Sequence, residues 1–376
     1  MNTVGVVRRP RPTERVEVTV VQITAELDET QGNTQLDVAG ETKLYEQLRN
    51  FWHPVAFSED LEDEPHQVTL FETRLAVARL DGKPYVFDDI CRHRGSALSL
   101  GRIDGCYLRC AYHGWAYDKE GTVVDIPARP ELNGKLKAQL PVYPAVESGG
   151  LVWTCMGDEP PVFPPAVLPE LDDPSFRIMR WEPYEWDCSV GRRLENYFDF
   201  SHFAHVHHGI LGDRDNAVIA DYEAYRDGGE IKINAGPFLE YTDNPKNSMV
   251  AGEGETYDAW KRYRVFMPNA MWLDSSAGPN ESYILFVAVA PVNRKRTRCY
   301  TFVARNFAYD MDEEFDRMQR VILAQDKPVV ESQRPEELPV ELTAEMHVKA
   351  ADLGTVIYRR WLMEFADGKI ELAPTA

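Results

Sequence analysis

Two closely spaced cysteine–histidine pairs constrain the fold of this chain more than any other feature of its sequence. In the segment CRHRGSALSLGRIDGCYLRCAYH, residues 91–113, Cys91 and His93 form a C-x-H pair, and Cys110 and His113 form a C-x2-H pair. Each pair follows a sequence typical of a β-hairpin, which can hold such a loop rigidly. The spacing therefore predicts one metal centre that two loops of a small β domain share.

Several kinds of site are compatible with these four side chains. A tetrahedral zinc ion is one interpretation, and core cysteines beside unrelated histidines are another. Zinc fingers, however, usually carry both cysteines in one loop and both histidines in the other. One cysteine and one histidine per loop is typical of a Rieske 2Fe–2S cluster, in which two thiolates bind one iron and two imidazoles bind the other. Cys106 lies outside this pattern, and we interpret it as a packed loop residue.

The patterning of the chain divides it into a β-rich part and a mixed part. LAVARL-DG-KPYVF and GWAY-DKEG-TVV predict hairpins, whereas residues 311–334 have a helical period. The predicted fold class is therefore α+β, an all-β domain followed by a larger domain of strands and helices. The predicted segments are a flexible extension (1–43), the β domain (44–158), a proline-rich linker (159–170) and the second domain (171–376).

Charge and composition exclude several classes of partner. The chain has 61 acidic and 41 basic residues, and its net charge of −20 argues against nucleic acid and anionic lipid as partners. The longest apolar run, residues 283–291, is about half as long as a membrane span and predicts a buried strand. The N-terminal sequence lacks the apolar segment of a secretory signal, so we expect a cytoplasmic protein. In that compartment the six cysteines favour metal binding over disulfides.

A second group of candidate metal ligands lies in the segment ENYFDFSHFAHVHHG. Four of the chain's nine histidines fall within seven positions there, namely His202, His205, His207 and His208. A cluster that transfers single electrons needs an acceptor for them. A mononuclear iron that binds O2 would serve, and such an iron needs two histidines, one carboxylate and open positions.

The helix predicted at 311–334 offers the carboxylate. At about 100° per residue, Asp326 lies about 40° from Ile322, inside the apolar stripe of the helix. The stripe consists of Met311, Phe315, Met318, Ile322 and Val329. A carboxylate that faces a core needs a cation or a hydrogen-bond donor. The pattern alone leaves three explanations open: a metal ion, a salt bridge to an arginine or lysine, and a helix that ends early at Pro328.

Together, the two groups of residues resemble a known family. The segment from Cys91 to His113 and the pattern N-x2-D-x2-H-x4-H are similar to the motifs of the Rieske non-haem iron oxygenases. EPYEWDCSVGRRLENYFDFSHFAHVH and AQDKPVVESQRP resemble stretches of methylxanthine N-demethylases and, more loosely, of dicamba and vanillate O-demethylases. The resemblance covers about residues 44–365. It implies a Rieske domain followed by a catalytic domain with a helix-grip-like antiparallel sheet, assembled head-to-tail as a homotrimer.

The resemblance also implies a role for each matching position. The 2Fe–2S cluster would be bound by Cys91, His93, Cys110 and His113, and the mononuclear Fe(II) by His202, His207 and Asp326. Asp199 would carry electrons to His202 from His113 of a neighbouring subunit. The alternative for Asp199 is a local helix cap or salt bridge, and Asn196 would serve only to order the site.

Geometry sets a condition on the histidines. His202 and His207 would lie about 140° apart on an ideal helix, so both reach one iron only if the helix is distorted or ends between them. His205 and His208 are absent from the family pattern, and packing, pocket lining and a supporting hydrogen bond all remain open for them. Candidate pocket walls, which could equally be core residues, are Trp260, Phe266, Trp272 and Phe286.

The function implied by the resemblance is that of the terminal oxygenase component of a monooxygenase. Electrons from NAD(P)H would arrive through a separate reductase or ferredoxin, because this sequence has no nucleotide-binding fingerprint. The leading reaction is N- or O-demethylation of a small substrate with formaldehyde release. Ring or aliphatic hydroxylation, including dihydroxylation, and a non-enzymatic electron carrier with a structural metal are the alternatives. The arginines at 92, 94, 102 and 109 form either a docking site for an acidic electron donor or a solvated surface.

Overall fold

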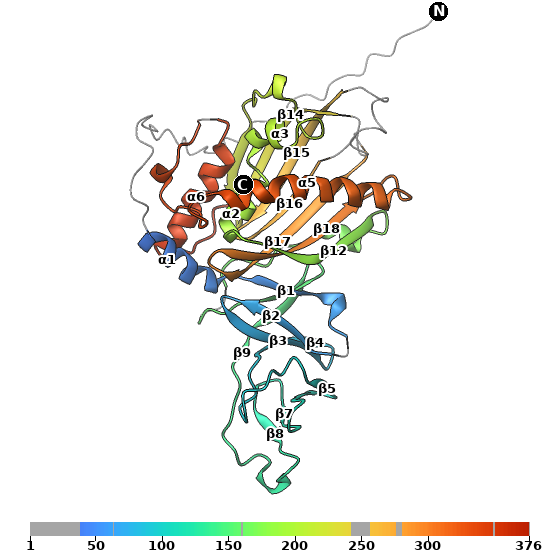
Figure 1. Cartoon of the computed structure of the whole chain (residues 1–376), viewed down its shortest axis with the longest axis vertical. Coiled ribbons are helices and arrows are strands. Elements are labelled where there is room, and N and C mark those ends of the chain that lie inside the picture. Colours follow the sequence, from blue (N-terminus) through green and yellow to red (C-terminus); the bar gives the residue numbers. More distant parts are fainter. Residues whose placement is uncertain are drawn as a thin grey trace, which may run out of the picture.

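The computed structural model describes residues 38–62, 64–158, 161–241, 256–275, 280–348 and 350–375. An all-β part is followed by a large sheet with helices on it, which confirms the predicted α+β fold (Figure 1). Residues 1–37 of the predicted extension lie outside the described residues. Helix α1, Val38–Gln47, crosses the boundary predicted at residue 43, because Leu44 and Tyr45 are buried against the core.

As far as its residues are described, the N-terminal part consists of three small antiparallel sheets. The first joins β1 (His53–Phe57), β11 (Leu151–Thr154) and β10 (Ala145–Ser148). The second joins β2 (His66–Leu70), β3 (Thr73–Leu80), β4 (Lys83–Asp88) and β9 (Val142–Tyr143). The third joins β5 (Arg102–Asp104), β6 (Tyr107–Arg109), β7 (Ala116–Tyr117) and β8 (Val123–Asp125). Both predicted hairpins are present, as β3–β4 and β7–β8.

The C-terminal part is built on a seven-stranded antiparallel sheet in the order β12-β18-β17-β16-β15-β14-β13. Its strands are β12 (Arg177–Trp186), β13 (Glu223–Asp227), β14 (Glu230–Tyr241), β15 (Thr256–Phe266), β16 (Ala270–Asp274), β17 (Tyr283–Asn293) and β18 (Arg296–Arg305). The first nine residues of β17 are buried, so the long apolar run is an internal strand, as predicted.

Helix α5, Asp312–Ser332, crosses the large sheet (Figure 1). It buries Ile322 and Asp326, as its period predicts, and it continues through Pro328, so the early end considered from the sequence is wrong. Val329 was expected on the buried stripe but is 48% exposed, and Val330 is buried instead. The proline interrupts the hydrogen bonding of the helix, and the last turn presents a different residue to the core.

Within the described residues, three further helices pack around this sheet. They are α2 (Val190–Asn196), α3 (Phe203–Val206) and α6 (Leu353–Ala366). Helix α6 packs against α1, β13 and β14. Among the helices that the structure describes, none is both long and apolar enough to cross a bilayer.

The two parts of the chain share one hydrophobic core, which extends from β1 into the large sheet. Phe163, Ala166 and Leu168 of the predicted linker are buried in this core, so the described part of that segment packs on the protein. A second, smaller core lies inside the N-terminal part and includes Cys91 and Cys110.

Candidate metal centres

The two cysteine–histidine loops have the same backbone design despite their different spacing. The N–H of Cys91 donates to the carbonyl of Ser96, and Gly95 donates back to the carbonyl of Cys91. In the second loop, Cys110 donates to Trp115, and Gly114 donates back to Cys110. Gly95 and Gly114 have φ values of 69° and 72°, a left-handed conformation that glycine adopts without strain. Each cysteine therefore begins a tight turn of equal length.

These turns bring the four predicted cluster residues together at the tip of the N-terminal part. Both thiols are buried, whereas the rings of His93 and His113 lie nearer the surface with their centroids 4.5 Å apart. The Cys91 sulfur contacts the hydroxyl of Tyr117 at 3.1 Å, and burial raises the pKa of this thiol. The Nδ1 atom of His93 is buried and has no hydrogen-bond partner among the described residues. Two adjacent thiols and an unused imidazole nitrogen fit an iron–sulfur cluster.

The four arginines around the loops differ in exposure. Arg92, Arg94 and Arg102 are exposed. Arg109, in contrast, forms ion pairs with Asp104 at 2.7 Å and Asp125 at 2.8 Å. The prediction of four surface arginines is therefore wrong for Arg109, which braces the second loop by also donating to the carbonyl of Gly114.

The second centre combines side chains from two distant segments. Candidate ligand atoms of His202, His207 and Asp326 all lie within 4.8 Å of one another. Asp326 Oδ1 is 3.0 Å from His207 Nε2 and 3.5 Å from His202 Nε2. Burial lowers the pKa of His202 to about 4, which keeps its imidazole neutral and able to bind a metal.

The backbone meets the condition that the sequence sets for these histidines. His202 ends a 3-10 turn, Phe200–His202, and the short helix α3 ends at Val206, immediately before His207. The tighter turn and the early end rotate both rings toward Asp326. His205 and His208 are exposed on the other side of this segment, where His208 Nδ1 accepts a hydrogen bond from the N–H of Arg214.

Gln325 fixes the orientation of His207. Its Oε1 atom lies 2.8 Å from His207 Nδ1 and can only accept, so Nδ1 carries the proton. The lone pair of Nε2 then faces the carboxylate of Asp326, and two acceptors in contact repel each other unless a cation or proton lies between them. This pairing fits a metal ion, and neighbours of this kind hold metal-binding histidines in place in other proteins. No sequence motif points to Gln325, although it directly precedes Asp326.

A buried arginine supports the same carboxylate from the side of α2. Asn196 donates to Asp326 Oδ1 at 3.4 Å, and Arg193 donates to Asn196 Oδ1 at 2.8 Å. The guanidinium of Arg193 lies between the rings of Trp186 and Tyr197, at 3.9 and 4.0 Å from their centroids. Asn196 thus orders the site, as the motif suggested, and Arg193 extends that support into the core.

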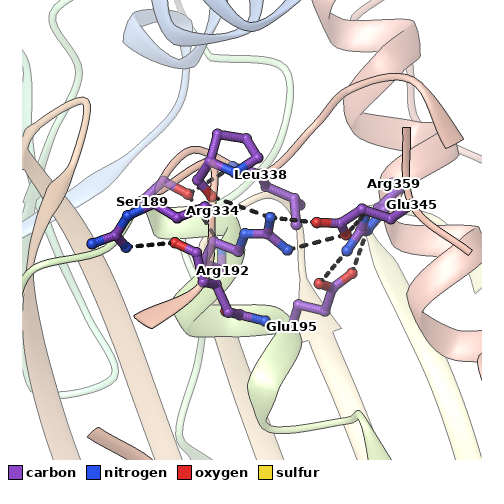
Figure 2. A network of polar contacts seen from close by, with 9 residues as sticks. Ser189, Arg192, Glu195, Arg334, Leu338, Glu345 and Arg359 are labelled. Carbon is purple, nitrogen blue, oxygen red and sulfur yellow. Dashed lines mark hydrogen bonds and ion pairs between the residues drawn. The ribbon is translucent and has the colours of Figure 1, made fainter. Parts of the chain in front are cut away.

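Helix α2 is anchored by an ion-pair network that links it to α6 and to the segment before α6 (Figure 2). Arg359 pairs with Glu195 at 2.6 Å and with Glu345 at 2.7 Å, and Arg192 pairs with the same Glu345 at 2.5 Å. Arg192, Arg359 and Glu195 are all buried. Because Glu195 precedes Asn196, this network sets the position of the end of α2.

Asp199 lies between this network and His202. Its carboxylate caps the 3-10 turn by accepting from the N–H of Ser201 at 3.1 Å, and one oxygen lies 4.0 Å from His202 Nδ1. Burial, together with Glu195 and Asp352, raises the pKa of Asp199 to about 6. The cap considered from the sequence is present, and the same carboxylate also faces His202.

A cavity lies beside the second centre. Its empty volume, which counts the gaps between wall atoms and the solvent at its opening, is about 690 Å³. Its apolar wall includes Trp181, Leu273, Leu285, Met318, Ile322 and Leu323. Its polar groups include Lys261, Tyr263, Ser275 and Gln319.

The aromatic residues considered as pocket walls do not line this cavity. Trp260 is 59% exposed, Phe266 and Phe286 are core residues, and Trp272 donates to Glu170. On the same three strands, Lys261, Leu273 and Leu285, which directly follow or precede Trp260, Trp272 and Phe286, line the cavity instead. Successive side chains of a strand face opposite sides of the sheet, so an assignment that is wrong by one position selects the wrong face.

Two family models match the chain in the two parts that the structure defines. Residues 51–144 match the Rieske [2Fe-2S] domain, and residues 186–368 match the vanillate O-demethylase oxygenase C-terminal domain. The first match contains both cysteine–histidine loops, and the second contains both segments of the mononuclear centre.

Relatives of known activity resemble the chain along most of its length. Methylxanthine N1-demethylase NdmA of Pseudomonas putida is 34% identical over 338 residues, covering 87% of this chain and 91% of the relative. Methylxanthine N3-demethylase NdmB of the same organism is 31% identical, with 90% and 94% covered. The solved structure of NdmA with caffeine superposes with a TM-score of 0.74 at 31% identity, covering 89% of this chain and 98% of that one. Dicamba monooxygenase bound to dicamba shares the fold, with a TM-score of 0.69 at 24% identity and coverage of 86% and 98%.

Proposed function

This chain belongs to the Rieske non-haem iron oxygenases, oxidoreductases with a 2Fe–2S cluster and a mononuclear iron, and we propose that it removes an N- or O-methyl group from a small organic substrate and releases formaldehyde. The observation that carries this proposal is the cavity beside His202, His207 and Asp326. An electron carrier needs neither this cavity nor a second centre, which counts against the non-enzymatic alternative.

The proposal assigns the metal ligands as follows. Cys91, His93, Cys110 and His113 hold the 2Fe–2S cluster, and His202, His207 and Asp326 hold the iron. The unused Nδ1 of His93 and the opposed acceptors of His207 and Asp326 support this assignment. When bound, the mononuclear iron supplies the activation of O2.

The protein side chains position the substrate and the ligands. The apolar wall formed by α5 and the large sheet holds the substrate next to the iron ligands and limits the access of water. Gln325 keeps the Nε2 lone pair of His207 available. Hydroxylation of a methyl group attached to nitrogen or oxygen gives a hemiaminal or hemiacetal, which breaks down to formaldehyde and the demethylated product.

Electrons reach the iron, in this proposal, from the cluster of a neighbouring subunit in a homotrimer. Within one chain, the strands β5, β7 and β8 around the cluster loops lie at the opposite end of the molecule from α3 (Figure 1). His113 is exposed, and Asp199 lies 4.0 Å from His202 at the edge of the buried site. Asp199 of one subunit and His113 of the next would therefore form the shortest route.

The source of the electrons is a separate reductase or ferredoxin, as in other terminal oxygenases of this family. The exposed Arg92, Arg94 and Arg102 support docking of an acidic protein near the cluster. We retain the predicted cytoplasmic location as part of the proposal, and it is supported by six cysteines that form no disulfide in the structure.

The test combines metal analysis with product analysis. We expect about three irons per chain and the spectrum of a histidine-ligated 2Fe–2S cluster. With a surrogate reductase, a screen of methylated heterocycles and aryl methyl ethers should yield formaldehyde in proportion to the demethylated product. A hydroxylated product without formaldehyde would support the alternative reaction, and zinc in place of iron would refute the assignment.

A further inference from the structure

The wall of the cavity contains a buried ion pair that stability does not explain. Lys261 Nζ lies 2.6 Å from Glu240 Oε1 and 3.0 Å from Ser275 Oγ. Lys261 is 3% exposed and Glu240 is fully buried. Removing two charges from water costs about as much as their attraction returns, so a buried pair seldom adds to stability. Its place on the wall of a binding cavity points to recognition.

Tyr263 adds a second hydrogen-bond donor to the same wall. It lies two positions after Lys261 on β15, and therefore faces the same side of the sheet. It is 2% exposed, and its hydroxyl has no hydrogen-bond partner among the residues that the structure describes. Burial raises the pKa of this phenol, so it keeps its proton. A buried O–H without an acceptor is costly, and a bound molecule could supply the acceptor.

These donors lie within reach of a molecule that also contacts the metal ligands. The ring of Phe203 lies 4.9 Å from that of His202, and the ammonium of Lys261 lies 5.4 Å from the centroid of the Phe203 ring. Glu240 and Ser275 occupy two of the three N–H groups of Lys261, which leaves one for a ligand. All of these side chains except Glu240 line the cavity.

The charges on the wall favour an uncharged acceptor. Glu240 neutralises Lys261, so a substrate carboxylate placed against the ammonium would also meet the carboxylate of Glu240. The apolar side chains of Leu273 and Leu285 on the same wall do nothing to compensate for the lost hydration of an anion. A carbonyl oxygen accepts the same hydrogen bonds and avoids both costs.

We propose that Tyr263 and Lys261 form a donor subsite that binds an uncharged carbonyl oxygen of the substrate, and that Glu240 makes this subsite select against carboxylates. The proposal rests on the proposed function in one respect, that the substrate occupies this cavity. It assigns a role in substrate selection to residues that do not touch the metal ligands.

Three probes of the same shape test the subsite: para-methoxyacetophenone, para-methoxybenzoate and para-ethylanisole. They share the methyl ether and differ in the group para to it, which is a neutral carbonyl, a carboxylate or an ethyl group without an acceptor. With iron-loaded protein, we expect the ketone to bind about 5- to 10-fold more tightly than either of the others, which corresponds to one or two neutral hydrogen bonds. Tighter binding of the benzoate than of the ketone would overturn the proposal.

Two variants test whether the preference for the ketone depends on Tyr263 and on the pair of Lys261 and Glu240. Tyr263→Phe removes only the hydroxyl, and the double variant Lys261→Met with Glu240→Gln removes the pair without leaving a buried charge. Each should lower the preference for the ketone over the ethyl compound at least about 3-fold. Tyr358→Phe is the matched control, because its hydroxyl is buried on the carbonyl of Pro268 outside the cavity and its loss should leave the preference unchanged. An unchanged preference in folded Tyr263→Phe, judged by circular dichroism, would refute the subsite.

Product analysis of the ketone separates this proposal from the proposed function. Formaldehyde release with an unchanged preference in the variants would refute the subsite and leave demethylation intact. A Tyr263-dependent preference with a hydroxylated product and no formaldehyde would support the subsite and refute demethylation.

Discussion

The cluster loops lie within 23 consecutive residues, 91–113, and expose His113, whereas the mononuclear centre joins two segments that are 119 positions apart and buries Asp326. The tasks that we propose for the two centres account for the difference. A centre that takes electrons from another protein must lie near the surface, because electron transfer requires close approach. A centre that combines O2 with a substrate benefits from a cavity that limits water.

The two centres also depend on different parts of the fold. Backbone hydrogen bonds within each loop hold the cysteines in place. The position of Asn196 and Asp199 depends instead on Glu195, which pairs with Arg359 of a distant helix (Figure 2). Substitutions far from the sequence motif should therefore disturb the mononuclear centre and leave the cluster intact.

Removing one ligand from each centre should give the largest and most separable effects. Asp326→Ala should leave about two irons per chain and an intact cluster spectrum, whereas Cys110→Ser should leave about one iron and no cluster spectrum. Both should lower turnover by at least about 1,000-fold, since neither centre substitutes for the other. Iron analysis with electron paramagnetic resonance checks both, and loss of both signals in either variant would contradict the independence of the two centres.

The same contrast explains what the sequence could predict. The cluster residues follow from local spacing, because their geometry is made within one segment. Helical periodicity placed Asp326 on the buried stripe but left its role open, and it failed at Val329. Only the resemblance to a known family assigned Asp326 to the iron. Gln325, Lys261 and Tyr263 carried no local signal, since their importance arises from tertiary contacts. The pocket walls were assigned to the wrong strand positions, because aromatic composition does not reveal which face of a sheet a side chain occupies.

Breaking the ion-pair network should destabilise the catalytic part. Glu195→Gln leaves the buried Arg359 with Glu345 as its remaining ion-pair partner among the described residues, and we expect a loss of about 3 kcal/mol in unfolding free energy. Asp316→Asn is the control, because its pair with Arg320 is exposed and worth at most about 1 kcal/mol. Denaturant unfolding measures both, with the cluster spectrum followed in parallel. Equal losses in the two variants would show that the network does not anchor α2.

Acid should lower the stability of the interface between the N-terminal and C-terminal parts, because His53 lies in this interface. His53 Nε2 donates to the carbonyl of Leu48, and Asn269 donates to His53 Nδ1, so the pair accommodates only the neutral ring. Burial lowers the pKa of His53 to about 4, below its value of about 6.5 in the unfolded chain. The unfolded state therefore binds more protons between these values, and stability should fall as the pH drops from about 6.5 to 4, by up to about 3 kcal/mol. His53→Gln should have a flatter profile in unfolding experiments across this range, and an unchanged slope would exclude His53 as the cause.

Substitution of Asp199 should slow electron delivery without affecting iron binding. Asp199→Asn keeps an acceptor for the N–H of Ser201 and removes only the charge, so the cap should persist. We expect iron content and the cluster spectrum to stay unchanged while turnover falls by about 100-fold. In a single turnover, the reduced cluster should stay reduced in the presence of O2 and substrate. Oxidation of the cluster at the wild-type rate would exclude Asp199 from the electron route.

Substitution of Gln325 should weaken iron binding and leave electron delivery intact, the opposite of the Asp199 variant, and its effect should be smaller. Gln325→Leu removes the acceptor of the His207 Nδ1 proton, so the ring loses its fixed orientation and the affinity for iron should fall by about 10-fold. The cluster of such a protein should still be oxidised at the normal rate in the fraction of chains that hold iron. Gln325→Glu keeps an acceptor at the same place and should restore most of the affinity. Competition with a chelator measures the affinity for iron. Equal affinities for wild type and Gln325→Leu would mean that the metal ligands alone orient His207. The mononuclear centre would then depend on its neighbours as little as the cluster loops do.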